Sequence, residues 1–192
     1  MTDSIDFYFD PLCPWAWRTS KWVRDLEAAG TLSVDWRFFS LSVINEGSED
    51  AMDDANNAGS VGLRTLALVK KMDGNEKAGK LYLAMGKRSH EVPRRLVLSL
   101  VHEALADVGL DPSLVEKAMG DSQTREHVLR DHRTAVGRVG AFGVPTIVLE
   151  SGKGIFGPVI EDEGGTEPAE MWSHVRWLIE KEGFFELKRE RG

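Results

Sequence analysis

The sequence predicts an α/β protein in which strand–helix–strand and strand–strand–helix units flank a long helical region. Three observations support this prediction. Runs of aromatic and β-branched residues at 5–9, 32–39 and 144–149 are typical of strands. Apolar residues recur at helical spacing through most of 60–139. A helix-length segment separates the first two runs, so we expect a right-handed connection between parallel strands.

The first strand is followed by a turn that leads into a helix. Asp10-Pro11 ends the strand, and apolar residues at helical spacing continue from 15 to 29 until Gly30 ends the helix. Cys13 is therefore expected at about the N-cap. Pro14 then occupies the first helical position, where its missing N–H costs nothing.

The rest of the chain divides into a loop, a helical stretch and a C-terminal unit. The acidic segment 45–57 is interpreted as a loop, and the helical stretch has a break near Asp73-Gly74. Residues 144–156 predict a β-hairpin, and Thr166-Glu167-Pro168 opens a last helix. The predicted domains are a two-part α/β domain, 1–44 and 141–192, and an inserted helical subdomain, 45–140.

Composition limits the classes of function. The chain has 192 residues, 42% of them hydrophobic and 29% charged, as in an ordinary globular protein. A net charge of −7 disfavours nucleic-acid binding, and no 18-residue apolar run predicts a membrane span. The N-terminus does not resemble a signal peptide, and the one cysteine excludes an internal disulfide. We therefore expect a cytoplasmic protein.

Cys13 is the candidate nucleophile. At a helix N-terminus the unpaired backbone N–H groups and the helix dipole both favour the thiolate, which is the reactive form. The alternative is that Cys13 is a small buried hydrophobe, as free cysteines often are. Trp15 and Trp17 flank the thiol, and one of them is expected to line a substrate pocket.

Other motifs give weaker signals. Gly152–Gly157 matches a dinucleotide fingerprint, but Pro158 follows where a helix would have to begin, so hairpin glycines are the better interpretation and no nucleotide is expected. His127 and His132 are five residues apart and do not share a helix face, and no metal-binding spacing occurs, so no metal is expected.

Three polar residues are further candidates for the site. Arg88 and His90 lie at the end of a predicted helix, where they either complement the helix dipole or contact an anionic or hydroxylated substrate. His132 is a candidate base, although a partial core contact is the simpler interpretation. Spacing alone does not place any of them near Cys13.

The predicted elements follow the order β-α-β, helical insertion, β-β-α, with Cys13 at the first helix N-terminus and Val144-Pro145-Thr146 opening the third strand. This arrangement resembles the DsbA-like thioredoxin-fold superfamily, which implies a thioredoxin-like βαβ…ββα fold with a large helical insertion. Four stretches cover nearly the whole chain: Phe9–Trp15, Ala84–His90, Phe156–Val159 and Phe184–Arg189. They resemble, in the same order, the actinobacterial mycothiol-dependent nitroreductase and mycoredoxin-like branch, and glutathione transferase kappa and 2-hydroxychromene-2-carboxylate isomerase are more distant members.

The resemblance also implies a site. Cys13 would be the nucleophile, and Pro145 would follow a cis peptide bond that faces it and leaves the backbone groups of Val144 free to bind a thiol compound. The family motif has a second cysteine where this chain has Ala16. A resolving thiol must then come from solution, with mycothiol expected and glutathione as the alternative. Related folds often form homodimers.

These observations give three functional hypotheses. The first is a monothiol oxidoreductase, in which Cys13 and a low-molecular-weight thiol reduce a mixed disulfide or a small electrophile. The expected contacts of thiol or substrate are Pro14, Trp15, Trp17, Arg88, His90, Val144 and Pro145. The second hypothesis is a thiol-cofactor transferase or isomerase of the kappa type. The third is a binding module without redox chemistry.

Overall fold

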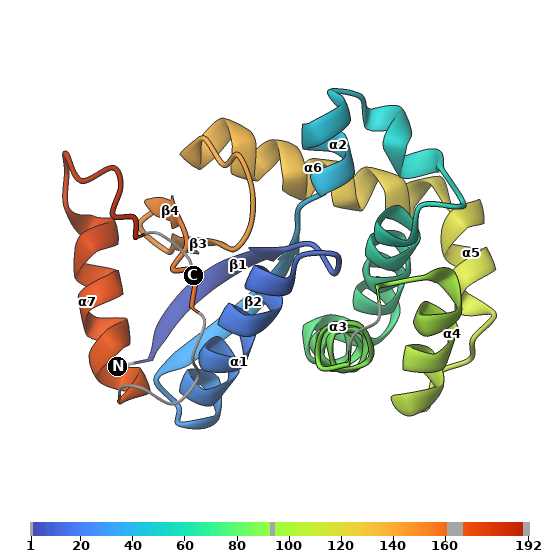
Figure 1. The fold of residues 1–192 in the computed structure, drawn as a ribbon, viewed down its shortest axis with the longest axis horizontal. Helices are drawn as coiled ribbons and strands as arrows, with labels where there is room; N and C mark the ends of the chain where they lie inside the picture. The colour runs from blue at the N-terminus through green and yellow to red at the C-terminus, as the bar shows by residue number, and fades with distance from the viewer. Residues whose placement is uncertain (1, 93–94, 161–166, 190–192) are drawn as a thin grey trace.

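A four-stranded mixed sheet organises the protein in the computed structural model, which describes residues 2–92, 95–160 and 167–189 (Figure 1). The strand order is β2-β1-β3-β4, with β1 parallel to β2 and antiparallel to β3, and β3 antiparallel to β4. The predicted thioredoxin-like α/β fold is confirmed. The strands are β1 (Asp3–Phe9), β2 (Leu32–Phe38), β3 (Thr146–Leu149) and β4 (Gly154–Phe156).

Helices cover the sheet and form a group at one end of the molecule. Figure 1 shows α3, α4 and α5 together at that end, α7 at the opposite end, and α6 running from α5 toward β3 and β4. The helices are α1 (Pro14–Ala28), α2 (Leu41–Glu46), α3 (Ala58–His90), α4 (Leu98–Asp107), α5 (Leu114–Gly120), α6 (Ser122–Val139) and α7 (Pro168–Glu180), with a 3-10 helix, η1, at Glu49–Asp53.

The segment interpreted as a loop, 45–57, is partly helical, so that prediction was wrong. It includes the end of α2 and all of η1, and the predicted domain boundary at 44/45 falls inside α2. The Ser40 hydroxyl accepts a hydrogen bond from Val43 N–H at 3.2 Å and so caps α2. Gly47 ends α2 after six residues in a left-handed conformation, φ 68°.

The break predicted near Asp73-Gly74 is present. Gly74 has φ 86° and ψ 177°, so the helix that runs through 58–90 changes direction there. Asn75, directly after it, binds the backbone of β2 at the edge of the sheet. It accepts from Trp36 N–H at 2.9 Å and donates to Val34 O at 2.7 Å. Lys70 Nζ donates to Trp36 O at 2.6 Å.

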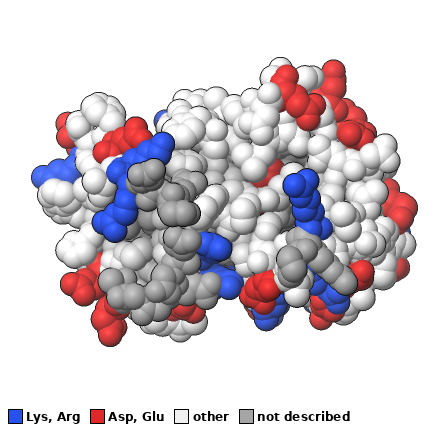
Figure 2. All heavy atoms as spheres, in the orientation of Figure 1, with Lys and Arg blue, Asp and Glu red and all other residues white. Residues whose placement is uncertain are grey.

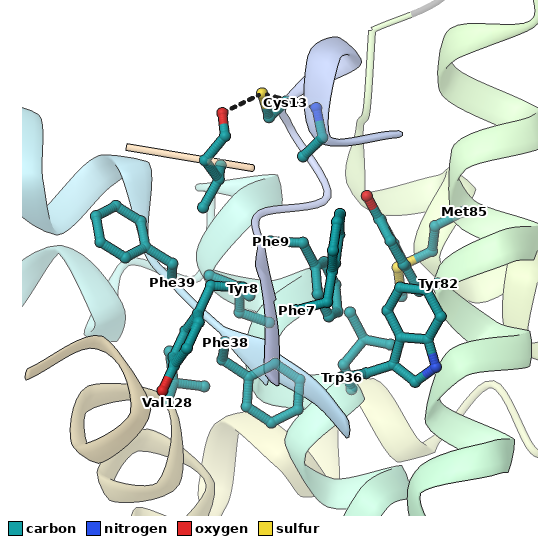
Figure 3. Packing of buried hydrophobic residues seen from close by; sticks show 14 of the residues in the cluster. Phe7, Tyr8, Phe9, Cys13, Trp36, Phe38, Phe39, Tyr82, Met85 and Val128 are labelled. Carbon is teal, nitrogen blue, oxygen red and sulfur yellow. Dashed lines mark hydrogen bonds between the residues drawn. The ribbon is translucent and has the colours of Figure 1, made fainter. Parts of the chain in front are cut away.

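Aromatic side chains fill the core between the sheet and α3 (Figure 3). The ring of Tyr82 in α3 stacks on Phe9 of β1, with centroids 3.8 Å apart, and meets Trp36 edge-on at 5.9 Å. Helix α3 also approaches α1 closely, since a Cβ at Gly86 would lie 2.1 Å from the Trp17 ring. Gly59 at the start of α3 lies against Leu12, and His90 at its end lies against Pro11, so both ends of α3 are beside the turn that carries the cysteine.

Candidate active site

Cys13 lies at the end of the turn between β1 and α1. Its N–H donates to Asp10 O at 3.0 Å and closes the turn. Cys13 is the N-cap of α1, and its sulfur accepts a hydrogen bond from Ala16 N–H at 3.4 Å, while Pro14 lies in the first turn. The predicted N-cap position is therefore confirmed. The residue is 7% exposed.

The sulfur faces the segment that precedes β3. The thiol of Cys13 donates to Val144 O at 3.4 Å, and Figure 3 shows this contact beside the one with Ala16 N–H. The Val144–Pro145 peptide bond is cis. None of the described residues accepts a hydrogen bond from Val144 N–H. The structure thus brings together Cys13, Val144 and Pro145, which lie more than 130 residues apart in the sequence.

The two contacts of the sulfur favour different protonation states. A carbonyl oxygen only accepts, so the contact with Val144 O requires the thiol proton. The Ala16 N–H and the positive end of the α1 dipole stabilise the thiolate. In Figure 2 the Asp and Glu side chains gather mainly at the margins of the viewed face, whereas Lys or Arg side chains also lie on both sides of its middle.

Asp10 lies beside Cys13 in the candidate site, and the sequence analysis missed this residue. Its side chain is 1% exposed. Oδ1 accepts from Leu12 N–H and Oδ2 from Leu41 N–H, both at 2.8 Å, so the carboxylate joins the Cys13 turn to the start of α2. Burial raises the pKa of Asp10 to about 6, although the two backbone hydrogen bonds act in the opposite direction. The only sequence signal was an Asp directly before Pro.

His90, a predicted substrate contact, lies against the same turn. Its Nε2 is 2.9 Å from Pro11 O, and because a carbonyl only accepts, Nε2 carries the proton. The imidazole also packs at a tilt on the Trp17 ring, with centroids 6.3 Å apart. Burial lowers the pKa of His90, so the ring is neutral at physiological pH.

The other two polar candidates contact different parts of the fold. Arg88 binds Glu103 and Asp107 of α4, with its Nη2 2.8 Å from Asp107 Oδ1. His132 is buried, and its Nδ1 accepts from Ser40 N–H at 3.2 Å. The structure therefore groups His90 with the Cys13 turn, Arg88 with α4, and His132 with the start of α2.

The two tryptophans beside the cysteine have different surroundings. Trp17 is 2% exposed and packs in the core, in van der Waals contact with Gly86 and Tyr82, so it does not line an open pocket. Trp15 is half-buried, and the Arg18 guanidinium lies 5.0 Å from its ring centre. Of the two, Trp15 is the one that fits the expected substrate contact.

An exposed aromatic pair borders the segment that faces the sulfur. Phe142 and Phe156 are 69% and 37% exposed, and their rings stack with centroids 4.8 Å apart. Directly after Phe156, Gly157 N–H donates to Pro145 O at 2.7 Å. The sequence analysis missed this pair because the two residues come from a loop and a short strand.

Comparison with known proteins identifies the family. A family model described as Rv2466c-like, mycothiol-dependent nitroreductase Rv2466c, matches residues 12–189. The chain belongs to this family. The Rv2466c-like family is one of thiol-dependent oxidoreductases, so the expected class of enzyme is confirmed. The uncharacterized protein Rv2286c of Mycobacterium tuberculosis is 33% identical over 190 residues, which are 97% of this chain and 81% of that protein.

Solved structures of low sequence identity share the fold. A probable DsbA oxidoreductase from Streptomyces coelicolor is 20% identical, with a TM-score of 0.62 over 98% of this chain and 94% of that one. The thiol-disulfide exchange protein alpha-DsbA2 of Wolbachia pipientis is 14% identical, with a TM-score of 0.63 over 92% and 82%. The cytosolic disulfide reductase DsbM of Pseudomonas aeruginosa, with GSH, is 19% identical, with a TM-score of 0.57 over 77% and 86%.

The described residues form neither a metal site nor a membrane-spanning helix. Within 2–92, 95–160 and 167–189, no three His, Cys, Asp or Glu side chains come together as metal ligands. In the same ranges no helix combines the length and the apolar character needed to cross a membrane. The glycines of the fingerprint-like stretch 152–157 belong to the β3–β4 hairpin, as predicted.

Proposed function

We propose that this protein is a cytoplasmic monothiol oxidoreductase, in which Cys13 reacts with a low-molecular-weight thiol that also takes the place of the missing resolving cysteine. The observation that carries the proposal is the position of Cys13, the only cysteine of the chain, between Ala16 N–H and Val144 O. Alanine at position 16 leaves no second thiol within the protein, so each redox cycle needs a thiol from solution.

The reaction is a thiol–disulfide exchange at Cys13. The Cys13 thiolate attacks one sulfur of a disulfide, a new S–S bond forms to Cys13, and the other sulfur leaves as a thiolate. Attack by a second low-molecular-weight thiolate then releases Cys13 and forms a free disulfide. With an electrophile that takes up two electrons and two protons, Cys13 and one thiol are oxidised to the same mixed disulfide, and a second thiol restores Cys13.

Mycothiol is the thiol that we propose, because the family model is named for it, and glutathione is the alternative. The residues beside the sulfur fit such a compound. Val144 N–H has no acceptor among the described residues, and it is available to an amide carbonyl of the thiol. Pro14 is exposed and Trp15 is half-buried, so both supply apolar surface next to Cys13 in the chain, whereas Pro145 is buried. The exposed pair Phe142–Phe156 supplies further apolar surface for a small electrophile.

The test is the covalent capture of the thiol. The protein is incubated with the disulfide of mycothiol, and separately with that of glutathione, and its intact mass is measured. We expect one adduct for each protein molecule with mycothiol, removal of the adduct by free mycothiol, and no adduct on Cys13→Ser. The proposal is wrong if the wild type forms no adduct with either disulfide, or if Cys13→Ser forms one.

The same variants separate the other hypotheses. A thiol-cofactor transferase or isomerase of the kappa type would keep much of its activity in Cys13→Ser, because the bound thiol would be the reacting group. A module without redox chemistry would have a thiol that alkylates slowly at neutral pH. We also propose that a homodimer is an available oligomeric state, which sedimentation of the full chain measures directly.

A further inference from the structure

One peptide unit in the Cys13 turn is held at both ends by side chains. At one end Leu12 N–H donates to Asp10 Oδ1 at 2.8 Å. At the other end of the same peptide, Pro11 O accepts from His90 Nε2–H at 2.9 Å. Asp10 lies within the turn, whereas His90 comes from the end of α3, 79 residues away.

This peptide decides the shape of the turn. The hydrogen bond from Cys13 N–H to Asp10 O closes a four-residue β-turn with Pro11 at the second position. The common turns with proline there differ mainly by rotation of the central peptide through about 180°. Rotation of the Pro11–Leu12 peptide would break both hydrogen bonds at once, and it would also need a positive φ at Leu12, which has a negative φ here. The two side chains therefore stabilise the turn shape that Leu12 itself favours.

Both side chains are themselves held in place. The second oxygen of Asp10 accepts from Leu41 N–H at 2.8 Å, and the carboxylate is 1% exposed. The His90 ring packs on Trp17, which is fully buried against α3. The turn also packs on α3 directly, because a Cβ at Gly59 would lie 2.3 Å from a methyl carbon of Leu12. The position of the peptide is thus set by three separate elements.

We infer that Asp10 and His90 are a pair of positioning residues for Cys13. By fixing the Pro11–Leu12 peptide, the Asp10–His90 clamp holds the Cys13 sulfur against Ala16 N–H, and without it the sulfur loses this stabilising contact. The inference deepens the proposed function, since it takes Cys13 as the reacting group. It assigns His90 a role through the turn, in place of the substrate contact expected from the sequence.

The test measures how fast iodoacetamide alkylates Cys13 in the full chain between pH 5 and 10, which gives the apparent pKa and the limiting rate. In His90→Leu the donor is lost, and we expect alkylation at pH 7 to slow by about 3- to 10-fold, as for the loss of one capping hydrogen bond, with the pKa shifted upward. His90→Gln keeps an N–H donor, and we expect a rate within about twofold of wild type.

A double-mutant cycle tests whether the two residues act on one peptide. Asp10→Asn keeps an oxygen for Leu12 N–H but places its NH2 group against Leu41 N–H, so we expect a rate between those of the wild type and Asp10→Ala, which loses both acceptors. Because either loss frees the same peptide, Asp10→Ala combined with His90→Leu should be little slower than the slower single variant. Strictly additive effects would contradict a shared clamp.

Asn75→Leu is the matched control, since it removes two hydrogen bonds to backbone from the same helix α3 but at the β2 edge. We expect it to lower the free energy of unfolding without changing the alkylation profile. If His90→Leu behaves in the same way as Asn75→Leu, then His90 is only structural and the inference fails. Alkylation needs no mycothiol, so this result is independent of the mixed-disulfide test of the proposed function.

Discussion

Two neighbouring strand-to-helix turns of this protein have the same cap geometry and different surroundings. After β1, the Cys13 sulfur accepts from Ala16 N–H at 3.4 Å. After β2, the Ser40 hydroxyl accepts from Val43 N–H at 3.2 Å. Because β1 and β2 are parallel neighbours, both helices begin at the same edge of the sheet. Asp10 contacts the N–H groups at both starts.

The difference lies in what faces each cap. Each turn is held by a histidine, but His90 donates to Pro11 O while His132 accepts from Ser40 N–H. Ser40 is 1% exposed, whereas Cys13 faces Val144 O beside a surface that includes exposed aromatic rings. The N-cap of one helix is therefore a buried hydroxyl, and the N-cap of the other is a candidate nucleophile. The two differ in that only Cys13 faces the segment that contains Val144.

The largest expected effect comes from Asp10, which joins the two turns. Burial raises its pKa to about 6, so between pH 3.8 and 6 the folded protein keeps a proton that the unfolded chain has released. The contribution of the Asp10 carboxyl to the free energy of unfolding is therefore fully present below pH 3.8 and is lost as the pH rises to about 6. Relative to Asp10→Asn, the wild type should lose roughly 3 kcal/mol of unfolding free energy across this range.

Urea unfolding of both proteins at several pH values measures the effect. His127 provides an internal contrast of opposite sign, because burial lowers its pKa to about 4. Its contribution is present above pH 6.5 and is lost as pH falls toward 4, so His127→Gln should alter the pH dependence in the opposite direction. A pH-independent difference between the wild type and Asp10→Asn would show that the Asp10 carboxyl is not buried in solution.

The second effect compares the reactivity of a cysteine at the two N-cap positions, 13 and 40. In Cys13→Ser combined with Ser40→Cys, the protein again has one cysteine at a helix N-cap, but at a position that is 1% exposed in place of 7%. We expect iodoacetamide to react with it about 100-fold more slowly than with Cys13, since buried structural cysteines are inert. Intact-mass time courses at pH 7 give both rates. Equal rates would mean that the cap position alone makes the sulfur reactive.

The smallest effect concerns the stability that each cap supplies. Ser40→Ala removes the acceptor for Val43 N–H and should lower the unfolding free energy by about 1 kcal/mol. Cys13→Ser keeps an acceptor for Ala16 N–H, so its unfolding free energy should stay within about 0.5 kcal/mol of wild type. Urea titrations at pH 7 measure the free energy of unfolding of both variants and of the wild type. A loss in Cys13→Ser as large as in Ser40→Ala would show that the sulfur contributes packing that a hydroxyl does not replace.

The sequence predicted those features of the fold that depend on residues close together in the chain. The N-cap at Cys13 follows from a strand, a turn and Pro14 in consecutive positions, and the α3 break follows from Gly74. Helix α2 was missed because six residues are too few to reveal a helical period, and only the cap at Ser40 supports it.

Contacts between distant residues could not be predicted in this way. Asp10 depends on Leu41 N–H, 31 residues away, and His90 on Pro11 O, 79 residues away. Arg88 looked available to a substrate because Glu103 and Asp107 lie on a separate helix. The resemblance to a family supplied the pairing of Cys13 with Val144-Pro145, which no spacing in the chain indicates.

The side chains on either side of the bend in α3 also affect how this protein meets other chains. Strand β2 is an outer strand of the sheet, and such strands can recruit a strand of another molecule through their free backbone groups. Here Asn75 and Lys70 already bind the outward groups of Val34 and Trp36. A second molecule would have to displace both side chains to extend the sheet there, so the bend at Gly74 protects the protein against aggregation through this edge.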